Sequence, residues 1–491
     1  MISAIASRVK KVCGTQCGRA ALLVAALGAV GVAQAQTAPA PASAAPAAPK
    51  SDGSLTWNGI TFYGIIDLGV QYQTHGVPVS DYFPAGTEAI VNKNSNGSVT
   101  AMTPNNLSQS RLGLSGIEPI GGDFSAVFRL ETFFNPQSGN LSDALKSITL
   151  NNGKPLAEQT TNADSSVAGQ LFAGAAYAGV SSKSLGTMTF GRHVTLLADG
   201  IGKYDPMGAA QAFSVIGWSG TAAGGGNTEN RRLDSSIKYN VQLNAIRLGA
   251  MYQIGGQRGS TNSGVQANIG ADIAGLSADA YYFHKKDAIA ASPLSHAQIV
   301  GTPATPATPA VPGIIDLGFS PSNTVAATVS DNTTYSLMAL YNFGGPKIYV
   351  GYEHIKFENP DNPLAAGALT IGGYVLGVVN NTAFTNPKIL QVFWAGVKFP
   401  LSDKLDITAA YYGYKQDDFT LGAASATCGT AKPAGACSGT ENAGSLVLDY
   451  KFSKRFDWYL GTMYTEVKDG LASGFLNDNT LSTTTGIRFR F

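Results

Sequence analysis

The sequence predicts an all-β fold, a 16-stranded antiparallel transmembrane β-barrel. Three observations predict it: segments of alternating apolar and polar residues recur along the chain, their connections alternate between short and long, and the composition is that of a membrane barrel. Charged residues make up 13% of the 491 residues, against roughly 25% in soluble domains. Glycine is abundant, with 58 residues, and tyrosine and phenylalanine contribute 20 and 22. The formal net charge of +1 offers no basic excess of the kind that nucleic-acid binding needs.

Residues 1–35 have the features of a secretory signal peptide. A basic stretch precedes an apolar run over 20–33, which is too short to span a bilayer as a helix. An A-x-A cleavage pattern follows at 33–35, so we expect the mature chain to begin at Gln36. An exported chain with no longer apolar run can enter a membrane only as a closed barrel.

Two segments make up the expected mature chain. Residues 36–54 are rich in proline and alanine and are predicted to be a linker. Residues 55–491 carry the strand periodicity and are predicted to form the barrel domain.

Sixteen segments of the barrel domain show the two-residue alternation of β-strands. An even number is what a bacterial single-chain barrel requires. The predicted strands are 59–73, 108–117, 122–134, 169–181, 185–193, 231–241, 244–254, 264–274, 276–287, 332–343, 346–358, 389–399, 403–416, 443–453, 455–468 and 479–491.

The connections between these strands alternate between short and long. Short turns include 118–121, 182–184, 344–345 and residue 454, and the long connections are 74–107, 135–168, 194–230, 255–263, 288–331, 359–388, 417–442 and 469–478. Outer-membrane barrels have this layout, with short periplasmic turns at one rim and long extracellular loops at the other. Structureless loops of this length argue against a compact soluble domain.

The last predicted strand shows the pattern most clearly. Its apolar parity ends in Ile487, Phe489 and Phe491, while Arg488 and Arg490 lie on the other parity. An arginine that faced lipid at mid-depth would cost roughly 2–4 kcal/mol, so we expect both arginines to face water inside the barrel.

The same parity argument predicts further charges in the lumen. Charged residues on the polar parity of their strands are Arg111, Arg129, Glu131, Arg232 and Lys238. Arg192 shares its parity with Met188 and Phe190, so it would face lipid unless the strand bulges or has ended.

Two of the four cysteines remain after the signal is removed. Cys428 and Cys437 lie nine positions apart in a predicted loop, and an even pair in an exported protein predicts a disulfide. No metal site and no cofactor are expected. The five histidines are scattered, and no catalytic motif accompanies them, so we do not expect an enzyme.

Several stretches, in the same order along the chain, resemble the general diffusion porins of Gram-negative bacteria, most closely the β-proteobacterial type. The stretches are 61–67, 109–116, 126–131, 186–192 and the terminal Phe491. The resemblance implies a homotrimer in the outer membrane, among lipid and lipopolysaccharide, with Phe491 read by the barrel assembly machinery. It also implies that the third long loop, 194–230, folds into the lumen. There Asp199 and Asp205 would face the basic wall residues, and Arg192 would join the constriction.

The expected function is a water-filled channel for passive diffusion of ions and small hydrophilic solutes. Because basic residues outnumber acidic ones among the predicted wall positions, a weak anion preference is expected. Two alternatives remain open: a solute-specific porin with a lumen binding site, or a structural or adhesion barrel plugged by its loops. In the first, inward aromatics would bind the solute; the favoured reading places them instead in the interface girdles. These aromatics are Tyr63, Tyr177, Tyr349 and Tyr412.

Overall fold

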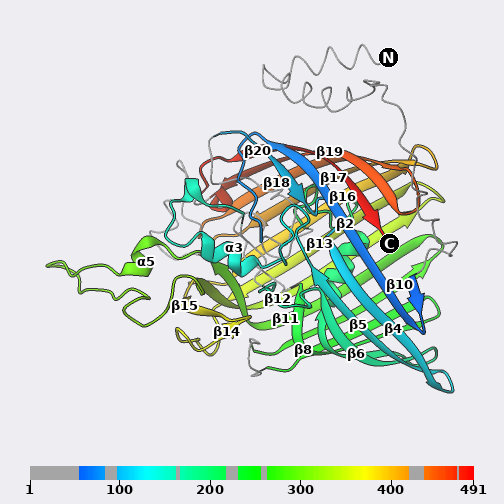
Figure 1. Cartoon of the computed structure of the whole chain (residues 1–491), viewed down its shortest axis with the longest axis horizontal. Coiled ribbons are helices and arrows are strands. Elements are labelled where there is room, and N and C mark those ends of the chain that lie inside the picture. The colour runs from blue at the N-terminus through cyan, green and yellow to red at the C-terminus, as the bar shows by residue number, and fades with distance from the viewer. Residues whose placement is uncertain are drawn as a thin grey trace, which may run out of the picture. The chain divides into compact units, whose positions relative to one another are not determined.

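The computed structural model describes residues 55–82, 97–161, 166–216, 231–255, 262–419, 436–472 and 475–491. Its described strands form one sheet of 20 strands, of which sixteen long strands close into an antiparallel barrel. Closure joins the last strand, β20 (Asn479–Arg490), to the first long strand, β2 (Ile60–Gln73), in antiparallel register (Figure 1). The predicted barrel is therefore confirmed.

All sixteen predicted strands are present, in the predicted order. Between β2 and β20 the wall is formed by β4 (Arg111–Gly121), β5 (Phe124–Phe133), β6 (Ala175–Ser182), β7 (Gly186–Val194), β8 (Arg232–Leu243), β9 (Ile246–Gln253), β10 (Gly264–Ile273), β11 (Leu276–Ser292), β12 (Thr324–Asn342), β13 (Lys347–Glu358), β16 (Lys388–Pro400), β17 (Leu405–Gln416), β18 (Gly439–Lys451) and β19 (Phe456–Asp469). Four short strands supplement the wall: β1 (Leu55–Trp57), β3 (Val99–Pro104), β14 (Thr370–Ile371) and β15 (Tyr374–Asn380).

The strands β11 and β12 continue well beyond the predicted ends at residues 287 and 332. A β-bulge between Lys285 and Ala288 shifts the register, after which the pairing resumes. Asp287 takes a positive φ of 50° in the bulge. The alternation breaks at this bulge. For this reason the periodicity placed the end of β11 too early in the chain and the start of β12 too late.

The outer face of the wall is apolar. Large hydrophobic side chains on the outward parity are exposed on strand after strand, for example Leu114, Phe190, Ile269, Val350 and Ile487. Such a band matches the lipid-facing belt of a membrane barrel. Within the described ranges, no helix is both long and apolar enough to cross a bilayer.

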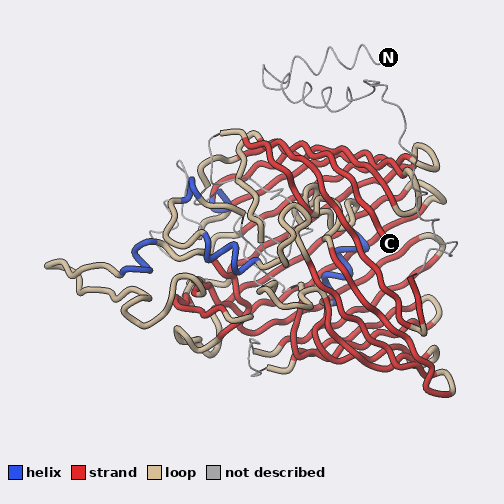
Figure 2. Tube along the Cα trace, viewed as in Figure 1, coloured by secondary structure: helices blue, strands red, loops and turns tan. Residues whose placement is uncertain are grey.

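Short helices lie in the long connections, as the blue segments of Figure 2 show. They are α3 (Ala144–Leu150), α4 (Leu196–Tyr204) and α5 (His296–Val300), with the 3-10 turns η1 (Leu156–Glu158) and η4 (Gly470–Ala472). Each of the three helices begins at a residue whose side-chain oxygen accepts a backbone N–H of the first turn, namely Asp143, Thr195 and Ser295.

Three of the long connections pack together above one side of the barrel. Asn152 of the second loop donates to the carbonyls of Pro321 and Thr324, at 2.7 and 2.8 Å. Tyr374 of the sixth loop donates its hydroxyl to Asp143, at 2.9 Å. An apolar cluster that includes Ile148, Val325 and Leu376 joins the three segments, so the second, fifth and sixth loops form one cap.

The third long loop crosses the inside of the wall. Its described part begins with α4, whose apolar side packs with inward-facing side chains of the opposite strands, such as Phe283 and Trp394. Trp394 also donates its indole N–H to the carbonyl of Tyr204, at 3.0 Å. Further along, Val215 accepts a hydrogen bond from the hydroxyl of Tyr414 at 3.1 Å. The described loop residues therefore cover the inner face of strands in the C-terminal half of the barrel.

The C-terminal phenylalanine completes the closure. Phe491 exchanges two backbone hydrogen bonds with Gly64, at 3.0 and 3.1 Å, and its ring lies 5.5 Å from that of Phe62. A β-carbon on Gly64 would lie 2.4 Å from the Phe491 ring, closer than real contacts allow. Gly64 thus provides the space that the terminal ring occupies.

Candidate functional site

The centre of the predicted site is a charge cluster on β4 and β5. Glu131 is almost fully buried and accepts from Arg129 at 2.6 Å, while Arg111 lies 3.5 Å from its other oxygen. Tyr63 of β2 donates its hydroxyl to Glu131 at 3.0 Å and accepts from the Nε of Arg129 at 2.7 Å. Parity correctly predicted that the three charges share the inner face; the participation of Tyr63 was not predicted.

The arrangement leaves the cluster with a positive excess. One carboxylate is shared by two guanidinium groups, and both arginines keep part of their surface open to the lumen, 27% for Arg111 and 38% for Arg129. A buried carboxylate requires such partners, because an uncompensated buried charge costs roughly 3–5 kcal/mol. Glu131 therefore orients the two arginines, whose remaining charge faces the water.

A second ion pair joins the third loop to the wall. Lys238 of β8 donates to Asp199 of α4 at 2.5 Å and to the carbonyl of Val194 at 2.8 Å. Lys238 is largely buried, whereas Asp199 is 56% exposed. This contact places the predicted acid Asp199 opposite the basic wall and fixes the start of the loop.

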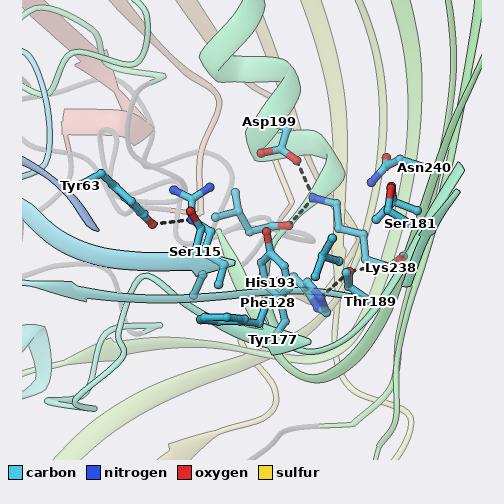
Figure 3. A pocket seen from close by; sticks show the side chains of 15 residues that line it. Tyr63, Ser115, Phe128, Tyr177, Ser181, Thr189, His193, Asp199, Lys238 and Asn240 are labelled. Carbon is cyan, nitrogen blue, oxygen red and sulfur yellow. Dashed lines mark hydrogen bonds and ion pairs between the residues drawn. The ribbon is translucent and has the colours of Figure 1, made fainter. Parts of the chain in front are cut away.

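The charge cluster and the Lys238–Asp199 ion pair border one cavity of about 590 Å³ on the inner wall. Its polar lining comes from adjacent strands, β2 to β8, with Asp199 contributed by the loop (Figure 3). The lining side chains with polar atoms are Tyr63, Ser115, Arg129, Tyr177, Ser181, Thr187, Thr189, His193, Asp199, Lys238 and Asn240. Water and solutes thus have a polar recess beside the charge cluster.

Arg192 is placed differently from the prediction. Its guanidinium donates to the carbonyls of Ser166 and Ala173 and pairs with Asp234 at 2.6 Å. A bulge at this point, marked by Ser235 with a φ of 48°, interrupts the register between β7 and β8. The side chain therefore avoids lipid, but it holds the second loop and does not line the cavity.

Arg232 lies near the charge cluster, against the backbone and ring of neighbouring residues. It donates to the carbonyl of Gly174 at 3.2 Å and sits over the ring of Phe133, 4.5 Å from the centroid. Gly174 in turn donates its backbone N–H to the carbonyl of Glu131. Arg232 thus adds positive charge at the rim of the cluster.

Asp205 is not an acid of the open lumen, contrary to the prediction. It is 2% exposed and accepts from the hydroxyl of Tyr412 at 2.6 Å and from the N–H groups of Met207 and Ala209. The carboxylate therefore ties the third loop to β17. Burial raises the pKa of Asp205, and the hydrogen bond from Tyr412 opposes that rise.

The four predicted inward aromatics are interior residues, so the favoured reading of interface girdles is wrong for them. Tyr349 and Tyr412 are buried, and Tyr412 donates its hydroxyl to Asp205 of the third loop. Tyr63 and Tyr177 line the cavity, and Tyr177 stacks on His193 with a centroid distance of 4.8 Å. They lie on the inner parity of their strands, whereas a girdle requires the outer one.

A third ionic group anchors the far end of α4 and was missed at the sequence level. Asp279 of β11 accepts from Arg247 at 2.8 Å and from the hydroxyl of Tyr204. Lys203 lies 3.5 Å from the same carboxylate. Arg247 lies between the outward Ile246 and Leu248, so parity would have placed it inside the barrel. Lys203 and Tyr204 lie in the third loop, where no strand parity predicts the direction of a side chain.

Charges near the closure behave as predicted. Arg488 and Arg490 face inward and share Asp457, at 3.1 and 2.6 Å. Cys437 is buried and disulfide-bonded, whereas its predicted partner Cys428 lies outside the described residues.

A closed membrane-type barrel with a charged, water-accessible inner wall defines a pore-forming protein. The family model for Gram-negative porins matches residues 20–470, and the chain therefore belongs to the Gram-negative porin family. The chain is accordingly an outer-membrane barrel.

Comparison with individual proteins agrees with this assignment. An outer membrane porin protein of Bordetella pertussis is 29% identical over 180 residues, which cover 37% of this chain and 38% of the relative. The anion-selective porin from Comamonas acidovorans has a TM-score of 0.55 at 17% identity, covering 88% of this chain and 99% of its own. OmpT, an outer membrane protein of Vibrio cholerae, has a TM-score of 0.52 at 12% identity, covering 89% and 100%. The two structural likenesses concern the fold alone.

Proposed function

We propose that the barrel is a water-filled channel for passive diffusion of ions and small hydrophilic solutes, with a weak preference for anions, and that it is not an enzyme. The observation that carries the preference is the unequal charge beside the cavity. Three basic residues, Arg111, Arg129 and Lys238, form ion pairs there with two acidic ones, Glu131 and Asp199. A net charge of this sign attracts anions to the path and repels cations.

The size of the preference follows from Coulomb's law. A unit charge about 10 Å from an ion in water contributes about 0.4 kcal/mol, which screening at 0.1 M salt lowers to about 0.15 kcal/mol. The effect has opposite signs for anions and cations, so each net charge changes their permeability ratio about 1.7-fold. A net charge of one corresponds to a ratio of about 1.7, a weak preference.

Export and assembly are part of the same proposal. We infer that residues 1–35 are removed, that 36–54 form a linker, and that a disulfide joins Cys428 to Cys437. The resemblance to general diffusion porins supports a homotrimer surrounded by lipid and lipopolysaccharide. Phe491 is proposed as the residue that the barrel assembly machinery reads, which is supported by the resemblance and by its place on the outer parity beside Gly64 and Phe62 at the barrel closure.

A solute-specific channel is the second candidate. The observation that favours it is the pair Tyr63 and Tyr177, whose side chains line the cavity. A specific channel would show current blocked by its solute at low concentration, and a general one would not.

The test is reconstitution of the mature protein in a planar bilayer under a salt gradient. Large ohmic steps with an anion-selective reversal potential support the proposal. Cation selectivity would overturn the assignment of the basic residues while keeping the channel, and folded protein without steps would favour a plugged or adhesive barrel. N-terminal sequencing of the exported chain tests cleavage before Gln36.

A further inference from the structure

The fifth long connection carries a sequence repeat that passage through the barrel does not use. Residues 302–310 read TPATPATPA, three copies of one tripeptide, and Val311 and Pro312 follow. The stretch 301–315 contains no charged residue. A proline at every third position removes backbone N–H donors, so the repeat is unsuited to pairing as a regular strand. Segments rich in threonine and proline are typical of O-glycosylated stalks.

The repeat stands on an anchored base. Before it, α5 begins with a capping box, in which the side chains of Ser295 and Gln298 each accept the backbone N–H of the other residue. After it, Ile314 is buried and donates its backbone N–H to the carbonyl of Gln298 at 3.0 Å. Ile314 also shares an apolar cluster with the buried Leu294. The two ends of the repeat are therefore held together on the cap.

Between these ends the chain forms an arm that projects from the cap. Thr302 and Val311 exchange two backbone hydrogen bonds of 2.9 Å, and Thr305 and Thr308 close a tight turn at the tip. Every residue of the arm, 302–312, is exposed. Beyond α5 the arm extends away from the strands of the wall (Figure 1). Because the long loops of an outer-membrane barrel are extracellular, the arm lies outside the cell.

The arm presents three threonine hydroxyls, and each threonine precedes a proline. A following proline restricts a residue to extended backbone, so these positions have the open conformation that an acceptor peptide needs in an enzyme cleft. The hydroxyl of Thr302 makes no hydrogen bond to the described part of the chain. The hydroxyl oxygens of Thr305 and Thr308 lie 2.6 Å apart and contact each other across the turn.

The sequence contains one further Thr-Pro pair, which shows the contrast. Thr103 precedes Pro104 in β3, but it is fully buried. Its hydroxyl donates to the side-chain oxygen of Asn106 at 2.9 Å. Exposure therefore separates the three threonines of the arm from the fourth, and only the arm offers the pair to an enzyme.

The chemistry of the tip favours covalent modification over the docking of a partner protein. Residues 302–310 consist of threonine, proline and alanine alone. Protein interfaces depend on anchors such as tryptophan, tyrosine and arginine, and the tip has none of these. Its reactive groups are hydroxyls on accessible backbone, which are the acceptors of glycosyl transfer.

We propose that the arm is a site of O-glycosylation and that the hydroxyls of Thr302, Thr305 and Thr308 are the acceptors. The donor is an oligosaccharide carried on a lipid diphosphate, and a transferase outside the cytoplasm joins the two. The threonine Oγ attacks the anomeric carbon, the bond from this carbon to the diphosphate breaks, and the lipid diphosphate leaves with the electron pair. The hydroxyl proton passes to a base of the transferase. The proposal rests on export to the outer membrane and not on conduction through the lumen.

The test is the intact mass of the full mature protein, isolated from outer membranes of the bacterium that makes it. Three variants are expressed in the same cells. T302V/T305V/T308V removes the hydroxyls with little change of side-chain shape, T302S/T305S/T308S keeps them, and T370V removes an exposed hydroxyl of the sixth loop that precedes isoleucine. Electron-transfer fragmentation of the peptide with the repeat locates each added group, and periodate oxidation identifies it as a glycan.

We expect the wild type, the serine variant and T370V to exceed the mass of the bare chain by whole sugar residues. The valine variant should lose this excess entirely, and fragmentation should place every glycan between residues 302 and 308. A wild-type mass equal to that of the bare chain would overturn the proposal. An excess that survives in the valine variant, or that resists periodate, would overturn it as well.

Bilayer conductance of the same preparations separates this proposal from the proposed channel. Steps of wild-type size from the valine variant show that it is folded, so its lost mass reports on the arm alone. Glycosylated wild-type protein that gives no steps would contradict the channel and leave the modification site standing. Wild-type steps from a chain of bare mass would contradict the modification site alone.

Discussion

Opposite charge changes in one ion-pair cluster should move ion selectivity in opposite directions. Glu131→Gln removes a negative charge from the Arg111–Glu131–Arg129 cluster, and Arg111→Gln removes a positive one. In E131Q the two arginines lose their shared carboxylate, but both side chains are partly exposed to the lumen and the glutamine oxygen can still accept from Arg129. In R111Q, Glu131 keeps its contacts with Arg129 and Tyr63. Both should therefore fold.

The magnitude follows from the estimate for a single charge. At 0.1 M salt, E131Q should raise the anion-to-cation permeability ratio about 1.7-fold, and R111Q should lower it by the same factor. At 0.01 M salt the Debye length is about 30 Å, so screening weakens and each change should grow to about 2.7-fold. The salt dependence distinguishes an electrostatic effect from a change in pore width, which would persist at every salt concentration.

The assay is the reversal potential of reconstituted channels under a fixed salt gradient, measured at two mean ionic strengths. Lys286→Gln is the matched control, since Lys286 faces outward and pairs with Asp361 at 3.0 Å, outside the lumen. Two shifts of the same sign, or shifts no larger than that of K286Q, would refute the placement of this cluster beside the ion path.

Three further predictions concern the anchors of the barrel and its loops. G64A should impair closure, because the added β-carbon would collide with the Phe491 ring; heat-modifiable gel mobility would measure the folded fraction, and normal folding would count against this contact. Y412F removes the hydrogen bond to the buried Asp205 and should lower the free energy of unfolding by about 1–3 kcal/mol in denaturant titrations. Y411F, which makes the same substitution on the outer face of the same strand, is the comparison. R192M should cost about 2–3 kcal/mol by freeing second-loop carbonyls, yet leave the reversal potential unchanged; a selectivity shift would place Arg192 back at the constriction.

The cluster on β4 and β5 shows what the two-residue periodicity can predict about the face of a side chain. Arg111, Arg129 and Glu131 lie in regular strands, where the two-residue alternation assigns each side chain to a face, and the structure confirms that assignment. Arg192 lies where the register breaks at Ser235. There parity gave the wrong face, and the resemblance gave a role that the contacts of Arg192 do not match.

The fifth and sixth connections show a similar limit. The sequence marked them as long loops, but their interaction with the second loop depends on contacts such as that of Asn152 with Pro321, 169 residues away. No local pattern predicts such contacts, because an asparagine side chain and a backbone carbonyl in irregular segments follow no periodicity.

The sequence by itself determined the number and order of the sixteen long strands, the layout of the rims, and the inward face of charges such as Arg111 and Glu131, because lipid outside and water inside impose a strict period of two. The tertiary structure alone decided what the third loop does with its two acids. Asp199 pairs with Lys238 at the lumen, and Asp205, six residues later, is buried against Tyr412, 207 residues away. A loop has no period, so only its packing against distant strands determines which of its charges face the water.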